Sequence, residues 1–97
     1  MAEVKILWSP KSITSLEEIA DYISINSPYY APIFIQKIIR SVERLKDFPL
    51  SGRIVPEFND KNIREVIFHN YRIVYRVKKD SVEISFVTHG AKLLEEL

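Results

Sequence analysis

Cysteine is absent from this chain of 97 residues. Its absence excludes disulfides, thiolate nucleophiles and cysteine-ligated zinc. Long apolar runs are also missing, since none approaches the ~18 residues that a membrane span requires. The first eight residues carry Glu3 and Lys5 among apolar neighbours, which is unlike the basic start and apolar stretch of a signal peptide. We therefore expect a soluble cytoplasmic protein that does not contact a membrane.

Glycine and histidine are scarce, with two of each in the chain. Gly52 and Gly90 stand near the ends of expected elements, and no repeat or flexible linker is visible. His69 and His89 are too far apart in the sequence to indicate a metal site, so we expect neither a metal nor a cofactor. The length predicts one domain, residues 1–97.

The net charge of +1 hides an uneven distribution along the chain. Residues 37–79 hold eleven basic and five acidic side chains, whereas both flanking regions are acidic. Such a basic middle segment points to an anionic partner, either nucleic acid or an acidic protein segment. The alternative is a solvated helix face followed by a charged hairpin, with no partner implied.

Two Ser-Pro pairs predict the starts of two helices. Ser9-Pro10 begins a helix that runs to about Asn26, and Ser27-Pro28 begins another that ends before Pro49. Apolar residues spaced by three and four give each helix one apolar face: Ile13, Leu16, Ile19, Ala20 and Ile23 in the first, and Ala31, Phe34, Ile35, Ile38, Val42 and Leu45 in the second. The two helices should form a hairpin.

Runs of β-branched and aromatic residues predict strands at residues 4–8, 63–68, 71–78 and 82–88, and residues 49–62 read as a loop. The order β-α-α-β-β-β predicts an α+β fold, in which the helical hairpin packs on one face of a mostly antiparallel sheet.

Two-residue turns at His69-Asn70 and Lys79-Asp80 would fix the strand register. One face would then be apolar and covered by the helices: Val66, Phe68, Tyr71, Ile73, Tyr75, Val77, Ile84 and Phe86. The opposite face would be polar and half basic: Glu65, Ile67, Arg72, Val74, Arg76, Glu83, Ser85, Val87 and His89. Glu83 would lie opposite Arg76, and Glu65 diagonal to Arg72 and Arg76, so these charges could simply neutralise one another.

Five pieces of the sequence resemble one family in order and spacing. They are Trp8-Ser9-Pro10, the helical hairpin, residues 48–57, the segment IREVIFHNYRIVYRV at 63–77 and the closing VTHGAK at 87–92. Together they resemble the RelE/ParE superfamily of type II toxins, and the ParE-like toxins within it. The resemblance covers nearly the whole chain and implies the RelE/ParE fold.

The resemblance also implies a toxin that arrests growth and is bound by a cognate antitoxin in a hetero-oligomer. ParE-like toxins inhibit DNA gyrase, serve plasmid stabilization and carry no accepted nuclease residues. The alternative is a RelE-like toxin that cuts messenger RNA on the ribosome without a metal. A third possibility is a member that still binds its antitoxin but has lost toxicity.

The candidate contact residues for an antitoxin or target are basic: Arg53, Arg64, Arg72, Arg76, His89 and Lys92. A nuclease would need a base, an acid and cations around the phosphate, and only Arg53, Arg64, His89 and Lys92 offer these groups. Arg64 is equally suited to bracing the structure, and His89 to closing a strand end with a hydrogen bond.

This sequence departs from the RelE-like nucleases at two places. Those toxins place further Lys or Arg residues where this chain has Val66, Ile67 and Phe68, and an aromatic or His where it has Leu93, Leu94 and Leu97. Lys92 also stands where the closing segment of ParE-like toxins usually has Arg, and a lysine cannot bind phosphate in the bidentate way that an arginine can. We therefore predict a gyrase inhibitor that binds rather than cuts.

Overall fold

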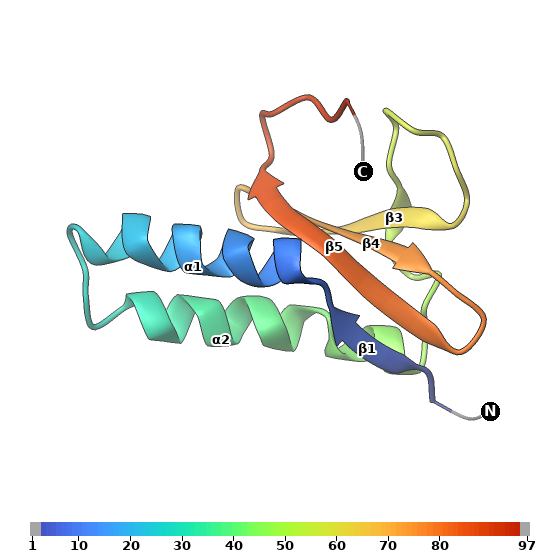
Figure 1. Ribbon diagram of the computed structural model, residues 1–97, viewed down its shortest axis with the longest axis horizontal. Coiled ribbons are helices and arrows are strands. Elements are labelled where there is room, and N and C mark those ends of the chain that lie inside the picture. Colours follow the sequence, from blue (N-terminus) through green and yellow to red (C-terminus); the bar gives the residue numbers. More distant parts are fainter. Residues whose placement is uncertain (1–2, 96–97) are drawn as a thin grey trace.

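The computed structural model describes residues 3–95, in which two helices pack against one face of a five-stranded sheet (Figure 1). Its elements are β1 (Lys5–Trp8), α1 (Pro10–Ser24), α2 (Ala31–Ser41), the 3-10 helix η1 (Glu43–Lys46), β2 (Arg53–Ile54), β3 (Ile63–Phe68), β4 (Tyr71–Val77) and β5 (Ser81–His89). The strand order is β1-β5-β4-β3-β2, and only β1 runs parallel to its neighbour. The predicted α+β fold is confirmed. None of the helices between residues 3 and 95 is long and apolar enough to cross a lipid bilayer.

Helix α1 begins as its sequence predicts. The Ser9 hydroxyl accepts a hydrogen bond from the Ser12 N–H at 3.0 Å, and Pro10 occupies the first turn, where its missing N–H costs nothing. The same hydroxyl donates to the Ser85 carbonyl at 2.8 Å. The start of α1 is thereby attached to the middle of β5.

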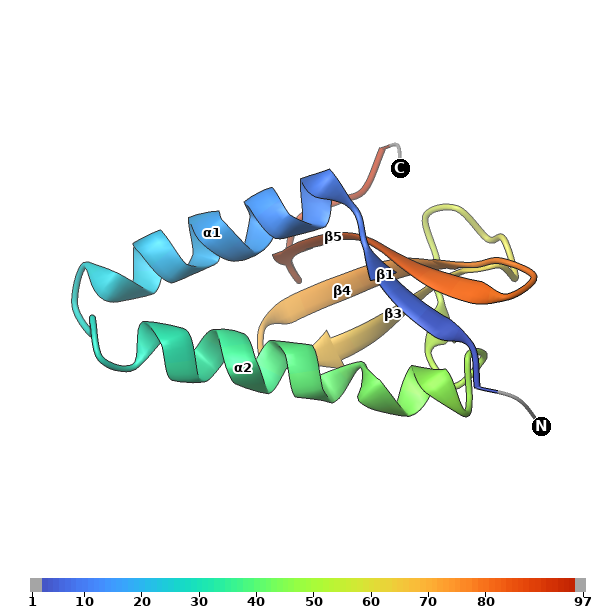
Figure 2. The same ribbon diagram turned by 60° about the horizontal axis from the view of Figure 1, so that its bottom comes forward.

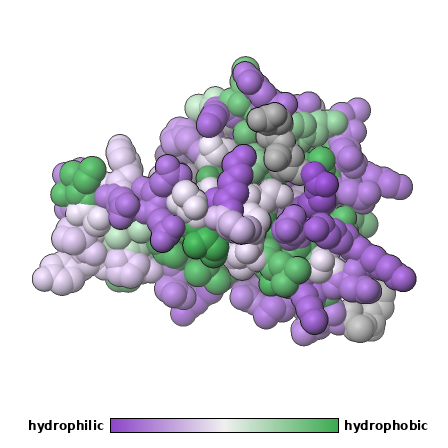
Figure 3. Space-filling view, viewed as in Figure 1, coloured by the Kyte–Doolittle hydropathy of each residue, from purple (hydrophilic) through white to green (hydrophobic). Residues whose placement is uncertain are grey.

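Helix α2 begins at Ala31, so the predicted start at Ser27-Pro28 is wrong. The Ser27 carbonyl accepts hydrogen bonds from the N–H groups of Tyr30 and Ala31, which makes residues 27–30 a turn rather than helix. Pro32, not Pro28, is the proline in the first turn of the helix. The connection between α1 and α2 lies at the end of the hairpin farthest from the sheet (Figures 1 and 2), where hydrophobic residues reach the surface (Figure 3).

The main core fills the space between the helical hairpin and the sheet. Its buried members are Leu16, Ile19, Phe34, Ile38, Val42, Leu45, Val66, Ile73, Tyr75, Val82, Ile84 and Val87. The phenol of Tyr75 is buried and fully hydrogen-bonded, because it donates to the Pro49 carbonyl at 2.8 Å and accepts from the Gly52 N–H at 3.0 Å. Burial raises the pKa of Tyr75.

A bulge in β5 changes which side chains face the helices. Tyr75 pairs with Ile84 and Val74 pairs with Phe86, so Ser85 is an extra residue without a partner. One extra residue reverses the alternation of all the residues that follow it. The predicted faces of Phe86, Val87 and His89 are therefore wrong: Val87 joins the main core, His89 lies opposite Tyr71, and Phe86 points to the other face.

The face away from the helices is covered, which corrects the prediction of an open, half-basic surface. The expected loop 49–62 contains β2, which pairs with β3, and the tail after β5 folds back beside this loop at the top of Figure 1. Together they enclose a second, smaller core of Val55, Val74, Phe86 and Leu94. The tail and the loop also bury charged side chains of this face.

Candidate functional site

Arg72 lies at the centre of a buried ion-pair network on the covered face. Its Nε donates to Glu65 at 2.6 Å, while Nη1 and Nη2 grip the two carboxylate oxygens of Glu57 at 2.7 Å each. Nη1 also donates to the Lys92 carbonyl at 3.2 Å, and Glu57 accepts the N–H of Leu94 at 3.1 Å. The side chains of Arg72 and Glu65 are 6% and 0% exposed. Arg72 therefore ties the tail and the loop to the sheet, and it is not available to a partner in this structure.

The charges in this network stabilise one another. Hydrogen bonds from Arg72 lower the pKa of Glu57 to about 2, against the opposing effect of desolvation. Hydrogen bonds to Glu57 and then to Glu65 raise the pKa of Arg72. Glu57 had no predicted role beyond its place in the family pattern, because nothing local in the sequence shows that a loop carboxylate meets a strand arginine.

Arg64 is used to brace the loop before β2. Its Nε donates to the Lys61 carbonyl at 2.8 Å, and its Nη1 donates to the carbonyls of Leu50 and Gly52 at 3.1 and 3.0 Å. A side chain at Gly52 would place its Cβ 2.5 Å from the Tyr75 hydroxyl and 2.6 Å from the Glu65 carbonyl, so only glycine fits there. Of the two roles considered for Arg64, the structure shows the bracing one.

Arg53 and His89 line one open cavity of about 450 Å³, together with Tyr71 and Arg72. Arg53 donates to Glu65 at 2.6 Å, although most of its side chain stays exposed. The Nδ1 of His89 accepts the Ala91 N–H at 3.3 Å, and its ring lies edge-on to Tyr71. The two arginines of this cavity are both paired with carboxylates: Arg72 is neutralised in the interior, and Arg53 is partly neutralised at the surface.

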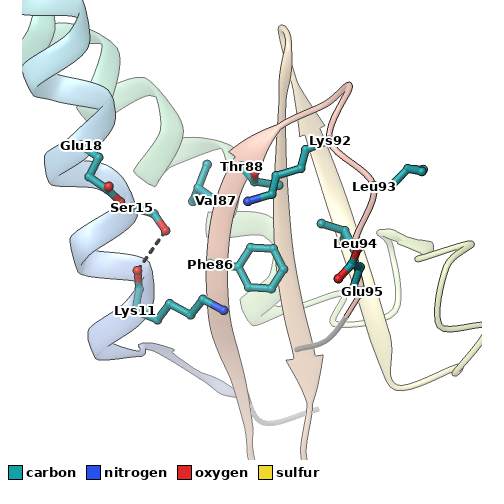
Figure 4. A pocket seen from close by; sticks show the side chains of 10 residues that line it. All are labelled: Lys11, Ser15, Glu18, Phe86, Val87, Thr88, Lys92, Leu93, Leu94 and Glu95. Carbon is teal, nitrogen blue, oxygen red and sulfur yellow. Dashed lines mark hydrogen bonds between the residues drawn. The ribbon is translucent and has the colours of Figure 1, made fainter.

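Arg76 and Lys92 lie elsewhere. Arg76 faces Glu83 in the predicted register, but Glu83 forms its ion pair with Lys78, at 3.6 Å, and Arg76 lines a separate cavity beside Asp60. Lys92 belongs to a third cavity, which Lys11 and Phe86 also line, and the Lys11 amino group lies 4.8 Å from the centroid of the Phe86 ring (Figure 4). The structure thus spreads the six predicted residues over several places.

The tail carries the three leucines that stand where nucleases have an aromatic or His. Leu94 is buried in the second core, Leu93 is 78% exposed, and Leu97 lies outside the described residues. Within residues 3–95, no group of three or more metal-ligating side chains is placed to hold an ion.

A trough between α1 and β5 was not predicted. Two cavities of about 460 and 560 Å³ adjoin there and share four lining residues: Ser15, Glu18, Val87 and Thr88. β1 pairs with β5 only along Ser81–Ile84, which leaves residues 85–89 of β5 with no strand on that side. An unpaired strand edge is a template for an extended peptide. The predicted strands already point to this free edge, because the first strand, with five residues, is too short to pair along the whole of the last strand, with seven.

Comparison with known proteins places these features in a family. The family described as "ParE toxin of type II toxin-antitoxin system, parDE" matches residues 6–94. The Sinorhizobium fredii (strain NBRC 101917 / NGR234) protein named "Putative toxin Y4kP" is 33% identical over 92 residues, which cover 93% of this chain and 92% of that protein.

Two solved structures share the fold. A chain from the chromosomal ParDE TA system of P. aeruginosa has a TM-score of 0.77 at 20% identity, covering 90% of this chain and 96% of its own. A chain from the toxin-antitoxin complex RelBE2 of Mycobacterium tuberculosis has a TM-score of 0.68 at 16% identity, covering 95% of this chain and 97% of its own. The family match along residues 6–94 and the 33% identical relative lead to one conclusion: the chain belongs to the ParE toxin family of type II toxin-antitoxin systems.

Proposed function

We propose that this toxin acts by binding DNA gyrase and inhibiting it, and that a cognate antitoxin neutralises it. The observation that carries the proposal is the internal neutralisation of the candidate catalytic cations. Arg53 and Arg72, the two arginines beside His89, are paired with Glu65 and Glu57 at 2.6–2.7 Å. A cavity with this charge balance offers little attraction to an RNA phosphate.

The geometry of the remaining residues also favours a binding protein. Cleavage through a 2'-hydroxyl requires a base, an acid and cations that converge on one phosphate. Arg64 donates its hydrogen bonds to backbone carbonyls, and Lys92 lines a different cavity from His89. The four residues that a nuclease would need therefore do not meet at one point.

The trough between α1 and β5 suits an antitoxin segment. The solved ParDE system and RelBE2 complex show that proteins of this fold occur with antitoxins. We infer that an extended segment of the cognate antitoxin lies along the free edge of β5 and forms a hetero-oligomer with the toxin, with Lys92 at one end of the trough and His89 at the other.

Co-expression tests this partner. The product of a small open reading frame adjacent to the toxin gene should co-purify with the toxin and raise its melting temperature by mass action. If no neighbouring gene product binds, the antitoxin part of the proposal is wrong.

Sequencing of message ends after brief induction tests binding against cutting. We expect ribosome-bound messages to stay whole, and His89→Gln to reduce toxicity by far less than the ~100-fold that loss of a general acid or base causes. Cleavage clustered at A-site codons and abolished by His89→Gln would move this chain to the RelE-like nucleases.

A further inference from the structure

The outer face of α2 and of the adjoining η1, called the outer face of α2 below, carries a stripe of exposed cations. Lys37, Arg40 and Arg44 follow one another at spacings of three and four residues and are all exposed. The buried side chains of the same segment lie on the opposite side: Ala31, Phe34, Ile38, Val42 and Leu45. The stripe is therefore not part of the core, and the fold does not require its charges.

These cations have no acidic partner among residues 3–95. Each carboxylate in the described ion pairs is taken by another base, and Glu43, which follows Arg40 by three residues, pairs with Lys46 at 2.7 Å. Lys37 instead lies over the ring of Tyr30, 5.4 Å from its centroid. Arg53 and Arg72, by contrast, are both paired with carboxylates, whereas Lys37, Arg40 and Arg44 form a row of unpaired cations on one surface.

Exposed apolar side chains continue the stripe toward the tip of the hairpin. Ile33 is 51% exposed, and beyond it Ile25 and Tyr29 are 75% and 91% exposed. Ile25, Ile33 and Tyr29 all gain by burial against protein, and of the three only Tyr29 can also stack on a base. A surface that combines cations with isoleucines fits an acidic protein segment with apolar side chains.

The neighbouring helix argues against a nucleic acid. Glu17, Glu18 and Asp21 are exposed on α1, which runs beside α2 (Figure 2). A long polyanion lying on the hairpin would meet this acidic helix as well as the basic one, and the net charge of the chain is only +1. A short acidic segment can cover α2 alone. A second copy of the chain, docking its acidic α1 on this face, is the alternative that sedimentation tests.

We propose that the outer face of α2, from Ile33 to Arg44, binds an acidic segment of the toxin's protein target. The identity of that target rests on the function proposed above, whereas the surface and its chemistry do not. None of the stripe residues lines the trough between α1 and β5, so target and antitoxin would use separate surfaces.

A charge-reversal pair tests this surface. Lys37→Glu/Arg40→Glu is compared with Lys61→Glu/Lys79→Glu, which makes the same change in net charge at exposed positions away from α2. Lys37→Gln/Arg40→Gln serves as a milder variant. Growth arrest, inhibition of purified gyrase, binding of the co-purified antitoxin and the sedimentation coefficient are measured for each.

We expect the α2 reversal to weaken growth arrest and gyrase inhibition roughly 10-fold or more, with a smaller effect at high salt, while the control pair matches the wild type. The neutral pair should show a partial loss, and all variants should still bind the antitoxin.

Equal toxicity of all variants would overturn the α2 surface and leave gyrase inhibition standing. Growth arrest that depends on α2 without any inhibition of gyrase would overturn gyrase inhibition and leave the α2 surface standing. Loss of antitoxin binding in the neutral pair would assign the stripe to the antitoxin and overturn the proposal. An α2-dependent affinity for a labelled DNA duplex or RNA oligonucleotide, or α2-dependent sedimentation of the wild type as oligomers, would replace the acidic segment with nucleic acid or with a second copy.

Discussion

Arg72 has a different role in the structure from the one that the sequence predicts. The sequence marks it as an exposed strand arginine with a cross-strand partner, yet its side chain is 6% exposed and contacts two carboxylates and a tail carbonyl. A buried charge is tolerated only when it is paired and hydrogen-bonded. Within residues 3–95, no buried polar side-chain atom lacks a partner, so the network is complete.

Replacing Arg72 should therefore cost far more than replacing Arg76. We expect Arg72→Ala to destabilise the fold by about 3 to 5 kcal/mol, because it leaves two carboxylates without their shared partner. Arg72→Lys keeps the charge but loses the bidentate grip on Glu57, so it should still lose stability while remaining folded. Arg76→Ala, at an exposed position, should change the free energy of unfolding by no more than about 0.5 kcal/mol. Urea denaturation compares the three variants, and equal effects at both positions would contradict the network.

Glu57 should make stability depend on pH below neutrality. The folded protein lowers the pKa of Glu57 from 4.5 to about 2, so its contribution is complete above pH 4.5 and is lost as the pH falls toward 2. Glu57→Gln should cost roughly 1.5 to 3 kcal/mol at pH 7, the value of a hydrogen bond to a charged group. The difference between wild type and variant should shrink on acidification. A difference that stays constant from pH 7 to pH 3 would exclude this role.

Individual elements were predictable where local signals decide them. Ser9-Pro10 set the start of α1, and the two-residue turns set the register of β3, β4 and the first part of β5, with His69 adopting the positive φ of 53° that such turns use. The bulge at Ser85 was not predictable, because an inserted residue leaves no mark in an alternating apolar pattern. The bulge places Phe86, Val87 and His89 on the faces opposite to those predicted, and His89 is the residue expected to act as acid or base.

The covered face could not be predicted either, since it depends on contacts between segments distant in sequence. The tail reaches the loop through Leu94 and Glu57, and β2 is only two residues long. Of the six candidate contact residues, Arg64 and Arg72 have structural contacts and Arg53 is partly neutralised by Glu65. Lys37, Arg40 and Arg44 lie off the apolar face of their helix, and that position alone does not mark a residue as a contact with a partner.

Two adjacent leucines test the packing of the tail. Leu94 is 8% exposed in the second core, whereas Leu93 is 78% exposed. Leu94→Ala should destabilise the fold by about 2 kcal/mol, the lower end for a core leucine because the tail can adjust. Leu93→Ala should have almost no effect on the melting temperature. If Leu94→Ala is equally silent, the tail does not hold the covered face closed.

At the scale of the whole molecule, the fold separates three surfaces. The tail and loop close one face of the sheet around paired charges, the trough beside β5 leaves a strand edge open, and α2 presents unpaired cations away from both. A domain of this size buries a limited core, so its open surfaces are the places where partners add stability. This division fits a toxin that is held by one protein while it recognises another.

Supercoiling of relaxed plasmid by purified gyrase measures whether this toxin inhibits gyrase. The purified toxin should block supercoiling in a concentration-dependent way because it binds gyrase, and addition of its antitoxin should restore supercoiling because the antitoxin binds the toxin. Full supercoiling at every toxin concentration, from a preparation that still arrests growth when expressed, would contradict the account.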